Sequence, residues 1–305
     1  MELFDLGLAY VWEYDDDFIF LTEKILQNAG LKTFRITYSN LHEVIDALKQ
    51  RKVGFNCYLD RAWDVDETFA ELGKMLNRRK TNIFNSYKKV LHAIDKASMH
   101  LEFITAGLNV PYSIIIPPHS EFEVIYISVD ELSILGRPFI IKPCNTTGGG
   151  VGVVMGAESL KEVLDERHTN LDDKYLIQEK IYPANFNGKR AWFRCFWAFG
   201  RPILLWWDDQ THLYDYVTQD EKEKYNLSKL DFIVRKIRSL TGLDFFSTEI
   251  VYSTKNEFVV IDYVNDQCDM RLKSKHADGV PDETVEQIIH NMRKEIQRLK
   301  RAQTF

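Results

Sequence analysis

One stretch of the sequence, "PFIIKPCNTTGGGVGVVM" (138–155), restricts the fold more than any other segment. An apolar run leads to Lys142, a polar and glycine-rich loop follows, and a second apolar run comes after the loop. Both flanks are rich in β-branched residues, which favour strands. The stretch therefore predicts a strand, a loop and a second strand. Walker loops and dinucleotide-binding fingerprints need a strand followed by a helix, so the pattern argues against both.

A loop between two strands can still bind an anion. Glycines let backbone N–H groups approach a phosphate closely, and Thr146 and Thr147 add hydroxyl donors. Lys142 adds a positive charge at the end of the first strand. The alternative is a flexible hairpin tip with a surface lysine. We favour a lid that closes over a ligand, because the loop has more glycines than a hairpin tip needs. Its successive glycines are Gly148, Gly149 and Gly150.

The order of the expected elements divides the chain into three parts. Residues 1–95 alternate strands and helices, which predicts a small parallel sheet with helices packed on it. Residues 96–177 and 178–305 carry antiparallel patterns, including two hairpins in the last part. A final amphipathic helix is predicted over residues 282–301. We therefore expect an α/β N-terminal domain followed by an α+β region made of two subdomains with antiparallel sheets.

Composition argues against several classes of partner. The chain has 305 residues and a formal net charge of -6, which is unfavourable for nucleic-acid binding because phosphate contacts need concentrated Lys and Arg. No stretch reaches the roughly 18 uninterrupted apolar residues that a membrane span needs. The start, "MELFDLGLAY", lacks the pattern of a signal peptide. We expect a cytoplasmic protein without nucleic-acid or membrane partners, and leave open whether it forms a homodimer.

Four motifs occur in an order that resembles the ATP-grasp family. Asp95-Lys96, on a predicted helix, precedes "AGLNVP" and then a strand. "FIIKP" with the glycine loop is similar to the family's central lysine strand and phosphate-covering loop. "YLIQEKI" is similar to its hinge strand, and "STEIVYSTKNEFVVIDYVND" to its closing hairpin, whose acidic residues bind Mg²⁺. The resemblance covers residues 85–269 and implies the same fold there.

The resemblance implies that the chain binds ATP. Lys96 and Lys142 would neutralise the phosphates, and Lys142 would also be a catalytic residue. The loop with Thr146, Thr147 and the three glycines would cover the phosphates. The residues that would border the adenine are Gln178, Glu179, Lys180 and Ile181.

The resemblance also implies a Mg²⁺ site, with Mn²⁺ as an alternative cation, formed by Glu249, Asp262 and Asn265. The family usually ends this hairpin with Glu-x-Asn, which puts both side chains on one face of a strand. Here two residues separate Asp262 from Asn265, so a regular strand would point them to opposite faces. Either the strand ends or bulges after Asp262, or Asp266 is the third ligand instead.

Arg194 lies where related ligases place an arginine that faces an acyl phosphate, and it would stabilise a developing oxyanion as a catalytic residue. The resemblance thus implies an ATP-dependent ligase, similar to D-alanine–D-alanine ligase, glutathione synthetase and glutamate-adding ligases. It would join a small-molecule carboxylate to an amine or thiol acceptor, or act on a short peptide. A small-molecule kinase is the first alternative, since Arg190 and the basic "RLKSKH" segment suit a phosphorylated acceptor. A non-catalytic nucleotide-binding module is the second.

Overall fold

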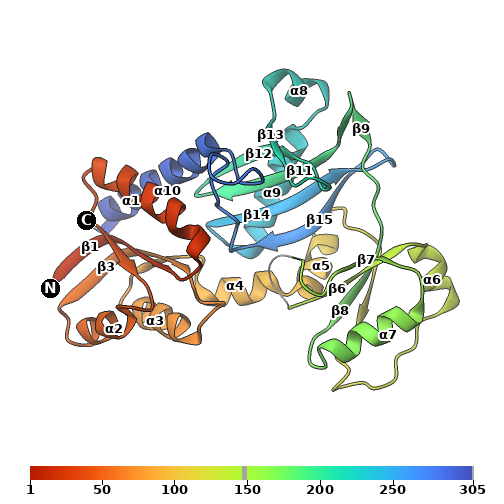
Figure 1. Cartoon of the computed structure of the whole chain (residues 1–305), viewed down its shortest axis with the longest axis horizontal. Helices are drawn as coiled ribbons and strands as arrows, with labels where there is room; N and C mark the ends of the chain where they lie inside the picture. The colour runs from red at the N-terminus through yellow and green to blue at the C-terminus, as the bar shows by residue number, and fades with distance from the viewer. Residues whose placement is uncertain (146–149, 304–305) are drawn as a thin grey trace.

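The computed structural model describes residues 1–145 and 150–303, which form three larger sheets and one two-stranded sheet, with helices packed around them (Figure 1). The N-terminal sheet comes first in the chain, the central sheet second and the C-terminal sheet last. The expected class, an α/β domain followed by an α+β region with antiparallel sheets, is confirmed. Within the described residues, no helix has the length and apolar character to span a membrane.

The N-terminal sheet is parallel and has the strand order β2-β1-β3-β4. Three helices alternate with its strands, which is the connection that parallel strands require. The helices bury apolar faces against the sheet, where Leu48, Phe69 and Leu76 meet Tyr58 of the sheet. The elements are β1 (Glu2–Tyr10), α1 (Asp16–Asn28), β2 (Thr33–Ile36), α2 (Leu41–Lys49), β3 (Val53–Arg61), α3 (Glu67–Arg78) and β4 (Asn82–Phe84), with a 3-10 turn η1 (Glu13–Asp15) before α1.

The central sheet has the order β5-β8-β6-β7, and each of its strand pairs is antiparallel. Its strands β6 and β7 lie before and after the glycine loop, so the predicted strands on both sides of it are confirmed. Helices α6 and α7 each begin with a serine that forms a capping box with a glutamate three residues later. The elements are β5 (Ser113–Ile116), α6 (Val129–Leu135), β6 (Phe139–Pro143), β7 (Val154–Ala157), α7 (Leu160–Thr169) and β8 (Tyr175–Glu179).

The C-terminal sheet is antiparallel and has the order β13-β12-β11-β14-β15. Both predicted hairpins are present, as β11–β12 and β14–β15. A smaller pair, β9–β10, precedes them, and α9 packs on β11 and β12. The elements are β9 (Asn185–Phe186), β10 (Lys189–Arg190), β11 (Trp192–Ala198), β12 (Arg201–Trp207), β13 (Tyr214–Tyr216), α8 (Gln219–Lys224), α9 (Ser228–Thr241), β14 (Phe245–Tyr252) and β15 (Phe258–Asn265).

Three helices connect the sheets to one another. Helices α4 (Tyr87–Ile94) and α5 (Lys96–Thr105) both contact β15, and α5 also contacts β8 of the central sheet. The last helix, α10 (Asp282–Gln303), returns to the N-terminal domain, where it packs against α1, β1 and β3, and it also contacts β11 (Figure 1). The start of α5 is therefore held close to the central and C-terminal sheets, where the predicted site residues lie.

Candidate nucleotide and metal site

Lys142 links the central sheet to the C-terminal sheet. It lies on β6 between two buried residues, and its Nζ donates a hydrogen bond of 3.1 Å to the carbonyl oxygen of Ile261 on β15. Burial lowers the pKa of Lys142, whereas the negative charges of Asp262 and Glu249 oppose this shift. The lysine before the glycine loop thus lies beside the predicted metal-binding hairpin, although more than one hundred residues separate the two in the sequence.

Lys96 belongs to the same group of charges, because its proximity lowers the pKa of Lys142 further. It is the first residue of α5, and Asp95 caps this helix by accepting hydrogen bonds of 3.0 and 3.1 Å from two backbone N–H groups of the first turn. The backbone N–H of Lys96 donates a 3.1 Å hydrogen bond to the carbonyl oxygen of Cys144, directly after β6. This contact joins the start of α5 to the lysine strand and brings the two lysines together.

Glu249 on β14 lies directly opposite Asp262 on β15. Opposed residues of an antiparallel pair point to the same face of the sheet, so the two carboxylates are neighbours. Glu249 is only 8% exposed. Burial raises the pKa of Glu249, and the negative charge of Asp262 raises it further, although Arg194 opposes the shift. A divalent cation would relieve the repulsion between the two carboxylates.

The pairing of β14 with β15 contains a bulge between Asp262 and Asn265. Ser247 pairs with Asn265 and Glu249 pairs with Asp262, so a step of two residues on β14 matches a step of three on β15. Because Ser247 and Glu249 lie on one face of β14, their partners also lie on one face. The two residues between Asp262 and Asn265 both pack against the core on the other side. The bulge therefore compensates for the unusual spacing in the sequence.

Asp266, the other predicted ligand, contacts the N-terminal domain. Its carboxylate accepts a hydrogen bond of 3.2 Å from Nε1 of Trp63, in the segment after β3, and one of 3.3 Å from Nε2 of Gln267. Burial raises the pKa of Asp266 to about 6. This residue thus holds two parts of the fold together, whereas Asn265 lies on the face of Glu249 and Asp262.

Arg194 and Trp192 orient the carboxylate of Glu249. The guanidinium Nη2 of Arg194 lies 2.5 Å from Oε1 of Glu249, and Nε1 of Trp192 donates a 3.0 Å hydrogen bond to Oε2. The guanidinium also lies over the ring of Trp207, at 4.6 Å from the ring centroid. Burial alone would lower the pKa of Arg194, but the negative charge of Glu249 raises this pKa above its ordinary value. Sequence reasoning missed Trp192, yet its position two residues before Arg194 places both on one strand face.

Two of the residues predicted to border the adenine have side chains that already bind other parts of the chain. Gln178 is 1% exposed, and its amide nitrogen donates a 2.9 Å hydrogen bond to the hydroxyl of Tyr263. Its side chain therefore belongs to the core packing. Glu179 accepts a 3.0 Å hydrogen bond from the backbone N–H of Tyr112, and its other oxygen lies 3.1 Å from Nζ of Lys255.

The other two predicted adenine neighbours lie just beyond β8. Nζ of Lys180 lies 5.8 Å from the ring centroid of Tyr182. Ile181 packs against a small apolar cluster on the C-terminal sheet. This cluster shares the face of Glu249, because its member Val251 is two residues further along β14. The cluster consists of Trp192, Val251, Val259 and Ile261.

The glycine loop is described only in part. The predicted phosphate-binding residues Thr146, Thr147, Gly148 and Gly149 lie outside the described residues. Gly150 is exposed and has a φ of 71°, which is a left-handed backbone conformation that favours glycine.

The donor set fits Mg²⁺. In the described part of the chain, no group of three His, Cys, Asp or Glu side chains is placed to hold a metal ion. Glu249, Asp262 and Asn265 instead combine two carboxylates with one amide on a single face. All three offer oxygen, which Mg²⁺ prefers, and Mg²⁺ commonly keeps several waters in addition to a few protein ligands.

Comparisons with known proteins identify the fold. No family model and no curated protein sequence matches the chain. A RimK domain ATP-grasp protein from Sphaerobacter thermophilus is 16% identical, with a TM-score of 0.62 over 95% of this chain and 98% of that one. D-alanine–D-alanine ligase from Bacillus anthracis, solved with ATP, is 12% identical, with a TM-score of 0.66 over 97% and 98%. The ATP-grasp ligase PsnB, solved with precursor peptide PsnA2 and AMPPNP, is 14% identical, with a TM-score of 0.61 over 95% and 98%.

The chain therefore has the ATP-grasp fold, as the order of its motifs predicted. The similarity extends over nearly the whole of each chain, so it includes the N-terminal domain as well as the two sheets that follow.

Proposed function

We propose that the chain is an ATP-dependent ligase that joins a carboxylate to an amine or a thiol. A carboxylate oxygen of the substrate would attack the γ-phosphate of ATP and release ADP. The amine or thiol would then attack the acyl carbon of the resulting acyl phosphate, and phosphate would leave. The observation that carries this proposal is that Lys142, from the central sheet, lies beside Glu249 and Asp262 of the C-terminal sheet.

The two ends of ATP would meet different surroundings. Ile181, which packs on the buried apolar cluster, would border the adenine, and Lys96 and Lys142 offer positive charge for the phosphates. Ile261 belongs to the apolar cluster, and its carbonyl oxygen accepts the hydrogen bond from Lys142. The apolar cluster and the cation are thus adjacent, as a nucleotide requires.

Glu249, Asp262 and Asn265 would hold the proposed Mg²⁺. When bound, the ion would neutralise phosphate oxygens during transfer. The contacts of Glu249 with Arg194 and Trp192 would keep this ligand in its orientation, because hydrogen bonds from outside the metal shell restrain the ligands within it.

Arg194 is the proposed stabiliser of the oxyanion that forms when the amine or thiol attacks. Its guanidinium is held by Glu249 and by the ring of Trp207. Its Nε is buried and has no hydrogen-bond partner among the described residues. This nitrogen is a donor that a substrate oxygen could accept from. A fixed positive charge of this kind lowers the energy of a developing negative charge without further reorganisation.

The acceptor belongs to one of two classes, small amino acids or peptides. Among the proteins with this fold, one is named for D-alanine and another was solved with a precursor peptide. Both classes therefore belong in the first substrate screen for this chain.

The kinase alternative receives less support from the basic residues that suggested it. Arg190 donates two hydrogen bonds to Asp209, at 2.6 and 2.8 Å. Arg271 forms ion pairs with Asp269 and Asp278, at 2.7 and 2.9 Å. These guanidinium groups are neutralised within the chain, which leaves less positive charge for a phosphorylated acceptor.

The non-catalytic alternative rested on the irregular spacing of Asp262 and Asn265. The bulge in β15 places both residues on the face of Glu249, which removes this reason for doubting a metal site.

The test is an ADP-release assay with Mg·ATP against amino acids, short peptides and phosphorylated polyols, with and without hydroxylamine. A ligase should release ADP only with a carboxylate substrate, and hydroxylamine should convert the acyl phosphate to a hydroxamate. A phosphorylated product without hydroxamate would select the kinase. If Mg·ATP produced no thermal shift in a protein that unfolds cooperatively, this result would contradict both the ligase and the kinase.

A further inference from the structure

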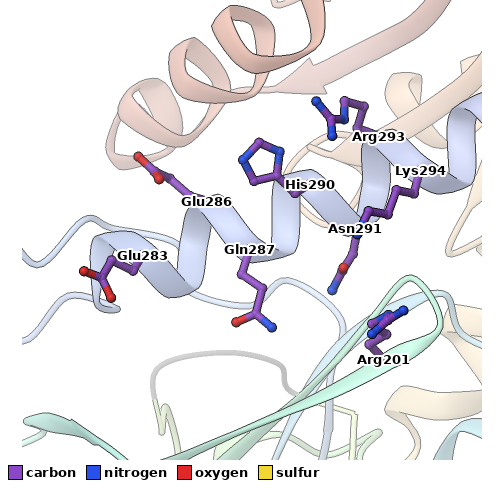
Figure 2. A pocket seen from close by; sticks show the side chains of 8 residues that line it. All are labelled: Arg201, Glu283, Glu286, Gln287, His290, Asn291, Arg293 and Lys294. Carbon is purple, nitrogen blue, oxygen red and sulfur yellow. The ribbon is translucent and has the colours of Figure 1, made fainter. Parts of the chain in front are cut away.

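A cavity outside the candidate nucleotide site lies between α10 and the turn that joins β11 to β12. Its volume is about 430 Å³, and most of its lining comes from α10, with Arg201 on the opposite wall. Figure 2 shows Gln287 and Asn291 pointing from α10 toward the turn that carries Arg201, whereas Glu286, His290 and Arg293 lie on the other flank of the helix. We call the space on the Arg201 side the α10 groove.

Asn291 is the group in this groove that most needs a partner. It is 5% exposed, and its amide nitrogen Nδ2 is buried and has no hydrogen-bond partner among the described residues. Nearly all buried polar groups in folded proteins are hydrogen-bonded, so a buried donor without a partner calls for an explanation. Nδ2 can only donate, and its complement is therefore an oxygen atom that accepts.

The charges beside Asn291 favour an anionic oxygen. Arg201 is exposed at the start of β12, and Lys294 follows Asn291 by three residues, so it lies on the same flank of the helix. Within the described part of the chain, neither cation takes part in an ion pair, in contrast to Arg190 and Arg271 near the candidate site. Two unneutralised cations thus flank a buried amide donor, and no carboxylate of the cavity lining lies between them (Figure 2).

We propose that the α10 groove binds a small oxyanion, a molecule with phosphate or carboxylate oxygens, between Asn291, Lys294 and Arg201. The groove is separate from the candidate nucleotide site. Arg201 pairs with Ala198, which lies four residues along β11 from Arg194, or roughly 13 Å. Because α10 also packs on α1, β1 and β3, the bound anion would connect the N-terminal domain to the β11–β12 hairpin.

The experiment uses the full chain, with inorganic phosphate and succinate as separate probes. Hydrogen exchange is measured for α10 and for the turn at residues 198–201, as the concentration of each probe is raised. Binding in the groove should slow exchange in both segments together. Slowing by phosphate alone, by succinate alone or by both identifies which oxyanion the groove accepts.

Two variants assign the binding to these residues. Arg201→Gln combined with Lys294→Gln should weaken the response about 10-fold or more, because two charge-assisted contacts are lost. Arg79→Gln, directly after α3, combined with Lys229→Gln, on α9, removes the same charge from exposed positions elsewhere. This control variant should respond as the wild type does.

Lys142→Ala separates this proposal from the proposed function. That variant should keep the response of the groove even where it no longer binds ATP. An unchanged response in the Arg201/Lys294 variant would overturn the proposal. So would a lack of slowing with both probes in a wild-type protein that is fully folded.

Discussion

Glu249 and Asp262 face each other across β14 and β15, and the bulge that follows Asp262 turns Asn265 to the same face of the sheet. This relationship places three oxygen-bearing side chains on one face, although the spacing of the last two differs from a regular strand pattern. Lys142 reaches the same place from the central sheet by donating to the carbonyl oxygen of Ile261. The predictions below test this arrangement one residue at a time.

Glu249→Gln should reduce Mg²⁺-dependent ADP release by at least ~10-fold, because the amide has no charge to attract the cation. The melting temperature should also fall, because glutamine keeps one oxygen for two donors, Trp192 and Arg194, and leaves the buried Arg194 without its counter-ion, so rates are compared well below the unfolding transition. ADP release is measured against Mg²⁺ concentration, together with thermal unfolding. Glu257→Gln, exposed at the turn of the same hairpin, is the matched control. An unchanged rate for Glu249→Gln would remove it from the metal site.

Asn265→Ala and Asp266→Asn should separate the two candidates for the third ligand. The first variant should raise the Mg²⁺ concentration needed for half-maximal turnover, because it removes an oxygen from the face of Glu249. The second should mainly change stability, because Asp266 binds Trp63 of the N-terminal domain. Magnesium titrations and thermal unfolding of both variants give the comparison. The reverse result, with only Asp266→Asn changing the Mg²⁺ requirement, would favour Asp266 as the ligand.

Lys142→Ala should weaken ATP binding by about 10-fold or more, because the phosphates lose a charge-assisted contact. The fold should persist, since the side chain is half-buried and makes one hydrogen bond, to a backbone carbonyl. Calorimetric titration with ATP and Mg²⁺ measures the affinity. Lys229→Ala, at an exposed lysine of α9, is the control for loss of one positive charge. Wild-type affinity in the Lys142 variant would count against the proposed site.

Asp60→Asn should reveal a pH dependence of stability in the N-terminal domain. Burial raises the pKa of Asp60 to about 6, and its carboxylate accepts hydrogen bonds of 2.9 and 3.0 Å from the N–H groups of Ala62 and Trp63. Between pH 4 and pH 6 the folded protein holds a proton that the unfolded chain has lost. As the pH rises from 4 to 6, the free energy of unfolding of the wild type, relative to Asp60→Asn, should therefore fall. Above this range the difference should stay constant.

Asp66→Asn is a contrasting variant, and urea titrations over a range of pH measure the free energy of unfolding of the wild type and of both variants. The hydrogen bond from the backbone N–H of Thr68 lowers the pKa of Asp66. The charged form of this carboxylate stabilises the fold, so the variant should lose stability above about pH 4 and approach the wild type as the pH falls. If the free energy of unfolding changed with pH in the same direction for both residues, burial would not be the cause of the raised pKa of Asp60.

Local sequence patterns predicted most of the elements because they depend on neighbours within one strand or helix. Alternating and β-branched runs predicted the strands on both sides of the glycine loop and both hairpins of the C-terminal sheet. Apolar residues at helical spacing predicted a final helix over residues 282–301, close to the observed α10. The order of the motifs predicted the ATP-grasp fold, since that order requires no knowledge of which side chains touch.

The sequence by itself determined the strand and helix order and the residue types offered for nucleotide and metal binding. Only the tertiary structure decided the register of β15, because a bulge depends on how two strands pair and not on the pattern of either. It also decided that Gln178 faces Tyr263, that Asp266 holds Trp63 and that Asn291 and Arg201 line one cavity. Each of these arrangements involves segments far apart in the chain, and only the packing of the sheets and helices brings the segments together.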